Sequence, residues 1–200
     1  MATDIPDTDR VTSAQQEVIE QRVRQIVAKA LELDVDEVQL SSSLVDELGA
    51  ESLDLLDIAF MLERAFKIEF PRIDILERAA GHFGEESLVV DGVVTDFGLA
   101  LLRRGMPEIA SERLQAGTRD VDVMRMITVQ SFVRIVTRLL EAKEQFPRTC
   151  PVCGAMMEES DIMPEFVCPA CGTIQPLPSG DEILLQDLIA LADDRNGSSQ

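Results

Sequence analysis

The sequence predicts a mainly α-helical protein with a small cysteine-rich module near its C-terminus. Apolar residues recur at helical spacing in several stretches, and the residues between turns are mostly good helix formers. The module is indicated by two Cys-x-x-Cys pairs within a proline-rich segment, residues 148–178. The chain has 200 residues, of which 46% are apolar, and this is enough for one or two domains with a real core.

The strongly acidic charge restricts the kinds of partner that the chain could bind. The net charge is −19, from 37 acidic and 18 basic residues. Nucleic acids and anionic membranes are disfavoured because both require positive charge to neutralise phosphates. A protein partner with a basic patch is favoured. The N-terminal residues have no apolar run, and no stretch is long enough to span a membrane, so we expect a cytoplasmic protein.

The N-terminal part of the chain predicts one helix followed by a long acidic loop. We expect residues 1–11 to fray and a helix to begin at Ser13, with Gln16 completing a capping box. The loop then runs from residue 34 to residue 51, with Leu44 holding it to the core. The apolar stripe of the helix consists of Ile19, Val23, Ile26, Val27, Ala30 and Leu31.

A second helix is predicted from Ser52 to about Lys67. Gly49 permits a turn before it, and Ser52 is a good N-cap. A serine hydroxyl at this end of a helix lies where a phosphate ester is electrostatically favoured, although capping is the more common role of such a serine. The expected core face is Leu55, Ile58, Ala59, Leu62 and Phe66, and the opposite face is Leu53, Asp54, Asp57, Phe60, Met61 and Arg64. This mixed acidic and apolar face predicts a contact surface for a partner, unless Phe60 packs under another part of the same chain.

The rest of the chain predicts shorter elements and then two more long helices. We expect a short helix from Ile73 to Ala80 ended by Gly81, and short extended segments or a tight turn within residues 88–94. A helix capped by Thr95 should follow. The later helices are predicted from Thr128 to Pro147, and from Asp181 to Asp194 after a Ser179–Glu182 capping box, with a flexible tail from Asn196 to Gln200.

Taken together, residues 13–72 and 122–145 resemble an acyl carrier protein. The matching stretches, in order, are the first helix, the acidic loop, Leu48-Gly49-Ala50-Glu51-Ser52-Leu53, the stretch from Leu62 to Pro71, and Ile127 to Val133. The resemblance implies a four-helix bundle in which a phosphopantetheinyl transferase attaches 4′-phosphopantetheine to Ser52. The thiol of this arm would carry acyl groups as thioesters to acyl-transferring or condensing enzymes with basic docking patches. The expected docking residues are Glu51, Leu53, Asp54, Asp57, Phe60 and Glu63.

The sequence departs from the family at three places. Glu51 replaces the usual aspartate before the serine, and Arg64 puts a positive charge on a commonly acidic face. The largest departure is an insertion at about residues 73–121, which could enlarge or cover an acyl-binding cavity. The expected organisation is a helical domain over 12–146 that contains this insertion, a ribbon over 147–178 and a C-terminal helix over 179–195. Specialised fatty acid, lipid or polyketide synthesis is the expected context.

The cysteine pairs resemble a zinc ribbon. Cys150, Cys153, Cys168 and Cys171 can supply four thiolates to a closed, structural Zn²⁺ site, and a glycine follows each pair. Two disulfides are disfavoured in a cytoplasmic protein, and a redox pair or an iron–sulfur centre is a weaker alternative. Residues 148–200 contain only two basic residues, which argues against a nucleic-acid-binding ribbon.

The sequence gives no indication of a catalytic site. It has no glycine-rich phosphate loop and no nucleophile with an evident base, and its only histidine is His82. We therefore expect a non-catalytic carrier. An unmodified interaction scaffold is the alternative.

Overall fold

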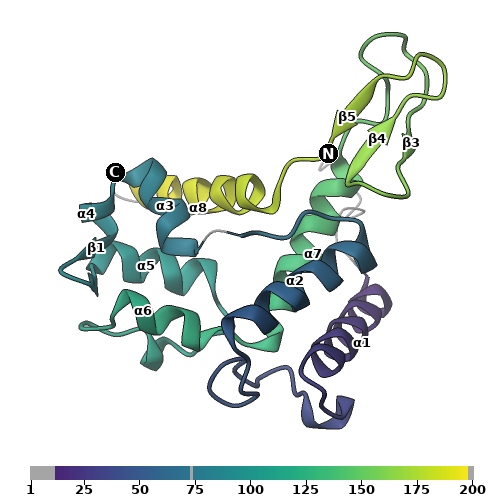
Figure 1. Cartoon of the computed structure of the whole chain (residues 1–200). Coiled ribbons are helices and arrows are strands. Elements are labelled where there is room, and N and C mark those ends of the chain that lie inside the picture. Colours follow the sequence, from purple (N-terminus) through teal and green to yellow (C-terminus); the bar gives the residue numbers. More distant parts are fainter. Residues whose placement is uncertain (1–11, 73, 198–200) are drawn as a thin grey trace, which may run out of the picture.

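The computed structural model describes residues 12–72 and 74–197, with side chains through residue 193. The mainly helical architecture predicted from the sequence is confirmed (Figure 1). The expected fraying of residues 1–11 and the end of the expected C-terminal tail, residues 198–200, lie outside the described residues. Every helix in the described ranges is too short or too polar to cross a lipid bilayer.

The bundle consists of α1 (Ser13–Ala30), α2 (Ser52–Phe66) and α7 (Val129–Gln145), which pack around one apolar core (Figure 1). The helix α1 begins where the sequence predicts, but its capping box is shifted by one residue. The N-cap is Thr12, whose backbone N–H donates to Gln15 Oε1 at 2.8 Å, so the expected Ser13–Gln16 pair is wrong. The core residues that the three helices contribute include Val23, Val27, Ile58, Leu62, Val133 and Val136, each completely buried.

The loop between α1 and α2 is held to the start of α7. It contains a short 3-10 turn, η1 (Val35–Glu37), and the completely buried side chain of Leu44. The backbone N–H of Leu44 donates to the carbonyl of Ile127 at 3.0 Å, and Ser43 Oγ donates to the carbonyl of Arg125 at 2.8 Å. These bonds fix the loop that leads directly into α2.

The inserted region is an ordered set of short elements with apolar clusters of its own. It contains α3 (Ile75–Phe83), α4 (Glu85–Leu88), β1 (Val89–Val90), β2 (Val93–Val94), α5 (Asp96–Gly105), η2 (Ser111–Arg113), α6 (Asp120–Val123) and η3 (Met124–Met126). The strands form an antiparallel hairpin in the stretch where extended segments or a tight turn were expected, and Thr95 caps α5 as expected.

The expected helix from Ile73 to Ala80 differs from the observed α3. Ile73 lies outside the described residues, and the helix continues through Gly81 to Phe83. Gly84, with φ of +85°, follows the helix instead. A Cβ added at Gly81 would meet nothing within 4 Å, so this glycine neither opens a turn nor makes room for a neighbour.

The C-terminal helix α8 (Gly180–Gly197) packs against the inserted region and the bundle. It contacts α3, α5 and α7, and Figure 1 shows it running beside them. The predicted capping box is present, since Ser179 Oγ accepts from the Glu182 backbone N–H at 3.2 Å and Glu182 Oε2 accepts from the Ser179 N–H at 2.8 Å. The helix extends beyond the expected end at Asp194, through Asn196 to Gly197.

The cysteine-rich module is a three-stranded antiparallel sheet that projects from the helices (Figure 1). Its strands are β3 (Glu158–Glu159), β4 (Glu165–Val167) and β5 (Ile174–Pro176), with Phe166 opposite Glu159 and Gln175. Its separate apolar cluster comprises Cys150, Met157, Phe166, Cys168 and Leu177.

Candidate functional site

Ser52 is the first residue of α2, and its side chain is exposed. The N-cap position belongs to Glu51, whose backbone N–H donates to Asp54 Oδ2 at 2.8 Å. The predicted capping role of Ser52 is therefore wrong, because Glu51 and Asp54 already complete the start of the helix. Among the described residues, none forms a hydrogen bond with Ser52 Oγ. The hydroxyl is thus available to solvent at the positive end of the α2 dipole.

The backbone before Ser52 is held in place from both sides. Gly49 adopts φ of +72°, a conformation that favours glycine, and nothing lies within 4 Å of an added Cβ there. Ala50 is buried, and its N–H donates to the carbonyl of Leu44 at 2.8 Å. The buried loop therefore fixes the position of the Ser52 backbone, from which the exposed side chain extends into solvent.

A cavity of about 370 Å³ lies beside Ser52. Its wall combines α2 and α7 with the inserted region and α8. The sequence did not indicate that α8 would take part. The lining residues are mostly apolar, and they include Leu55, Leu56, Ala59, Phe70, Ile75, Met106, Met124, Phe132, Ile135 and Leu184. The cavity volume falls within the roughly 300–1,000 Å³ typical of small-molecule sites.

The outer face of α2 exposes apolar and acidic side chains near Ser52. Leu53 is 74% exposed and Phe60 is 49% exposed, while Asp57 and Glu51 are also exposed. Asp54 is half-buried, and its carboxylate accepts from the Glu51 N–H. These positions agree with a surface that is open to a partner.

Arg72 modifies this face in a way that the sequence did not indicate. Its guanidinium carbon lies 4.2 Å from the centroid of the Phe60 ring, and its Nη2 lies 2.8 and 2.7 Å from the two carboxylate oxygens of Glu63. Glu63 also accepts from the Phe70 N–H at 2.9 Å. Phe60 is therefore partly covered by its own chain, and the charge of Glu63 is already balanced. In the sequence, the only indication of these contacts is that Arg72 directly follows Phe70-Pro71, which ends the helical region.

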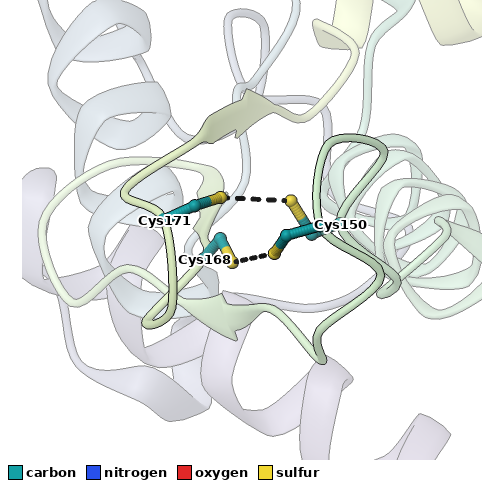
Figure 2. Close-up of side chains that lie close together, drawn as sticks. Cys150, Cys168 and Cys171 are labelled. Atoms are coloured by element: carbon teal, nitrogen blue, oxygen red, sulfur yellow. Dashed lines mark hydrogen bonds between the residues drawn. The ribbon is translucent and has the colours of Figure 1, made fainter.

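The four cysteines come together on two facing loops. Cys150 Sγ lies 3.6 Å from Cys171 Sγ (Figure 2). Cys153 Sγ lies 3.4 Å from Cys168 Sγ. All four sulfur atoms lie within 4.8 Å of one another. Four thiolates around a tetrahedral Zn²⁺ at 2.3 Å would be separated by about 3.8 Å, whereas disulfide sulfurs are separated by about 2.05 Å. The arrangement thus fits a four-thiolate metal site and excludes disulfides.

Hydrogen bonds around the cluster shift two of the four thiols toward the thiolate form that a metal requires. The backbone N–H of Cys153 lowers the pKa of Cys150 to about 6. A hydrogen bond with the side chain of Thr173 lowers the pKa of Cys171. For Cys153, a backbone hydrogen bond with Ala155 lowers the pKa, but hydrogen bonds with the side chains of Cys168 and Cys171 outweigh it and raise the pKa to about 12. The glycine after each pair has a positive φ, +75° at Gly154 and +73° at Gly172, which allows the chain to turn tightly around the sulfur atoms.

Comparison with known proteins supports the carrier resemblance. Residues 21–80 match a family model described as the phosphopantetheine attachment site. This match covers the end of α1, the acidic loop, Ser52, α2 and the beginning of the inserted region. No solved structure matches the chain. Residues 21–80 are therefore similar to a phosphopantetheine-attachment domain, which is consistent with an acyl-carrier-like domain, and the chain combines them with a four-cysteine cluster that is compatible with a zinc ribbon.

Proposed function

We propose that this protein is an acyl carrier protein whose 4′-phosphopantetheine arm is attached to Ser52. The single observation that supports this most directly is the free, exposed Ser52 hydroxyl, located at the start of a helix and beside an apolar cavity. The match to the phosphopantetheine-attachment family includes this serine. The cargo would be acyl intermediates of specialised fatty acid, lipid or polyketide synthesis in the cytoplasm.

Attachment of the arm breaks the phosphoanhydride bond of coenzyme A and forms a phosphodiester to the serine. Ser52 Oγ attacks the β-phosphorus of coenzyme A, a bond forms between that phosphorus and the serine oxygen, and adenosine 3′,5′-bisphosphate leaves. The serine proton passes to a base on the phosphopantetheinyl transferase. The new phosphodiester is an anion at the N-terminus of α2, where the unpaired backbone N–H groups and the helix dipole favour negative charge.

The loaded arm would present its thioester next to the outer face of α2. Leu53 and Phe60 supply apolar contact, and Asp54 and Asp57 supply negative charge for basic residues of a transferase or condensing enzyme. Glu51 adds a further exposed carboxylate next to the attachment site. Because Arg72 balances Glu63, we expect Glu63 to contribute less to docking than Asp57 does.

The ribbon is proposed to bind Zn²⁺ in a structural role. Cys150, Cys153, Cys168 and Cys171 would complete the tetrahedral shell and leave no open position for a substrate. The metal would stabilise a module whose own apolar cluster is small.

Intact-mass spectrometry tests the proposal. The full chain is incubated with a phosphopantetheinyl transferase and coenzyme A, and one phosphopantetheine increment is expected. The Ser52→Ala variant should show no increment. Ser13→Ala is the matched control, because Ser13 is also an exposed serine at the first residue of a helix. An unmodified wild-type chain with an active transferase would support the scaffold alternative instead.

A further inference from the structure

The outer face of α2 leads directly to the cysteine-rich module. Leu53, Phe60 and the C-cap residue Lys67 follow one another at intervals of seven residues, so they form one line along this face, the α2 stripe. At 1.5 Å per residue, the stripe is about 21 Å long. Lys67 Nζ at its end lies 2.9 Å from Asp161 Oδ1. The stripe therefore ends against the loop of residues 160–164, which joins β3 to β4.

A second lysine fixes the module against the end of α2. Lys143 lies near the end of α7, beside which the module projects (Figure 1), and its largely buried ammonium group pairs with Glu159 of β3. The same Nζ donates to the carbonyls of Phe66 and Lys67, at 3.3 and 3.2 Å. A cation is favoured at this end of a helix. Because one ammonium group binds both β3 and the end of α2, the module has a defined position relative to the α2 stripe.

The 160–164 loop exposes large apolar side chains next to a carboxylate. Ile162 is 89% exposed and Met163 is 54% exposed, and the exposed side chain of Asp161 directly precedes them. The α2 stripe has the same character, since its exposed leucine and phenylalanine lie among carboxylates. A single exposed apolar side chain needs no explanation, but this pair extends a surface of matching chemistry.

The charge of this combined surface indicates the kind of partner that it fits. Residues 148–178 contain four acidic residues, and Arg148 is their only basic one. A second copy of the chain, with its net charge of −19, would be repelled. A protein that presents basic residues around an apolar surface is favoured instead.

The length of the surface indicates which step this partner performs. A phosphopantetheinyl transferase acts on the Ser52 oxygen itself and must cover the N-terminal end of α2. An enzyme that receives the acyl group is separated from Ser52 by the arm, so it can lie further along the α2 stripe. A standard interface buries about 800 Å² on each side and is about 30 Å across, which is enough to cover the stripe and the 160–164 loop together.

We propose that the 160–164 loop is a second docking surface for the enzyme that receives the acyl group from the arm. Ile162 and Met163 contact an apolar part of this enzyme, while its basic residues face the carboxylates of the loop and of α2. This inference depends on the proposed attachment of the arm to Ser52. It assigns to the cysteine-rich module a role in the choice of the receiving enzyme, in addition to the structural role of its metal.

Photo-crosslinking in cells of the source organism identifies what contacts the loop. A photoreactive benzoylphenylalanine replaces Ile162 in the full chain, and intact mass confirms that the arm is attached. The matched control has the same probe in place of Val152, which is also apolar and 73% exposed. Val152 lies between two of the cysteines, and Cys168 follows the end of β4 that is opposite to the 160–164 loop. The control therefore probes the other end of the same module.

The probe at position 162 should capture an enzyme that accepts the acyl group from the loaded chain in a purified assay, and the probe at position 152 should not. For this enzyme, Ile162→Ser should lower kcat/KM about tenfold, because the apolar contact of the isoleucine side chain is lost. Val152→Ser should leave kcat/KM unchanged. Circular dichroism establishes that both serine variants fold.

The outcomes separate this inference from the proposed function. If no arm is found on the wild-type chain after exposure to an active transferase, the carrier function itself is wrong. If the arm is attached, the docking inference is overturned when the probe at position 162 captures nothing, captures the same proteins as the probe at position 152, or captures only the transferase, a second copy of this chain or a protein that does not accept the acyl group. An unchanged kcat/KM for Ile162→Ser also overturns it.

Discussion

Arg78 and Asp181 form an ion pair that joins residues 103 positions apart in the sequence. Arg78 Nη2 lies 2.6 Å from Asp181 Oδ1, and the arginine side chain is only 5% exposed. The other carboxylate oxygen of Asp181 accepts from the Arg72 backbone N–H at 3.1 Å. This pair links the inserted region to α8 at the point where both line the cavity beside Ser52.

Removing Asp181 should destabilise the protein strongly. In the Asp181→Ala variant, the buried guanidinium of Arg78 loses this carboxylate partner. Removing one partner of a buried ion pair lowers the free energy of unfolding by about 3 kcal/mol. The measurement is urea unfolding followed by circular dichroism. Asp187→Ala is the control in the same helix, because the Arg138–Asp187 pair is about one third exposed on both sides and should contribute less than about 1 kcal/mol. If the two variants lost the same free energy of unfolding, this would contradict a buried ion pair between α3 and α8.

Two glycines should respond to alanine in opposite ways. Gly180→Ala puts a Cβ 2.6 Å from the Glu69 carbonyl oxygen and 2.7 Å from Pro71 N, so the backbones must separate and stability should fall by more than about 1 kcal/mol. Gly81→Ala in α3 meets no neighbour and should raise stability by about 0.5–1 kcal/mol. Thermal unfolding of both variants checks this. A Gly180→Ala variant as stable as the wild type would show that α8 does not lie this close to the α2–α3 linker.

Removing the metal should loosen the ribbon and leave the bundle folded. The ribbon has its own apolar cluster, which is distinct from the bundle core, and metal binding stabilises only the segment that supplies the ligands. We expect a chelator to increase amide hydrogen exchange over residues 148–178 while α1, α2 and α7 remain protected. A metal assay under reducing conditions should find one zinc per chain. Collapse of protection in the bundle at the same chelator concentration would contradict this independence.

The contact between Lys67 and Asp161 should depend on pH. Lys67 Nζ lies 2.9 Å from Asp161 Oδ1, and this hydrogen bond lowers the pKa of Asp161 below its ordinary value of 3.8. Because the folded-state pKa is lowered, the contact is fully present above the ordinary value and is lost as the pH falls through the lowered one. An NMR titration of the Asp161 carboxyl should show its pKa return to the ordinary value in Lys67→Gln. An unchanged pKa would mean that the contact is absent in solution.

Local patterns in the sequence predicted the long helices of this fold but not the short helices α4 and α6 of the inserted region. The apolar spacing placed α1, α2 and α7, and Thr95, Thr128 and the Ser179–Glu182 pair marked real helix starts. The other errors concern single boundaries. Glu51 rather than Ser52 occupies the N-cap of α2, because the Asp54 carboxylate is in reach of its backbone N–H. Gly81 lies inside α3, since neighbouring packing can keep a helix intact through a glycine.

Contacts between distant segments could not be predicted in this way. The position of Arg72 over Phe60 and against Glu63 depends on how the chain turns after Pro71. The cavity beside Ser52 combines side chains from four separate parts of the chain, including Leu184 of α8. No local periodicity encodes such a combination, because it follows from the packing of the inserted region and α8 against the bundle.

The central claim is that the Ser52 hydroxyl carries the phosphopantetheine arm, and peptide mapping of the modified protein tests it most directly. Cleavage after Lys29 and Arg64 releases residues 30–64 as one peptide, which contains Ser41, Ser42 and Ser43 as well as Ser52. Fragmentation of this peptide by tandem mass spectrometry, after co-expression with a phosphopantetheinyl transferase, should place the phosphodiester on Ser52. An arm on one of the other three serines, or an unmodified peptide despite an active transferase, would contradict the account.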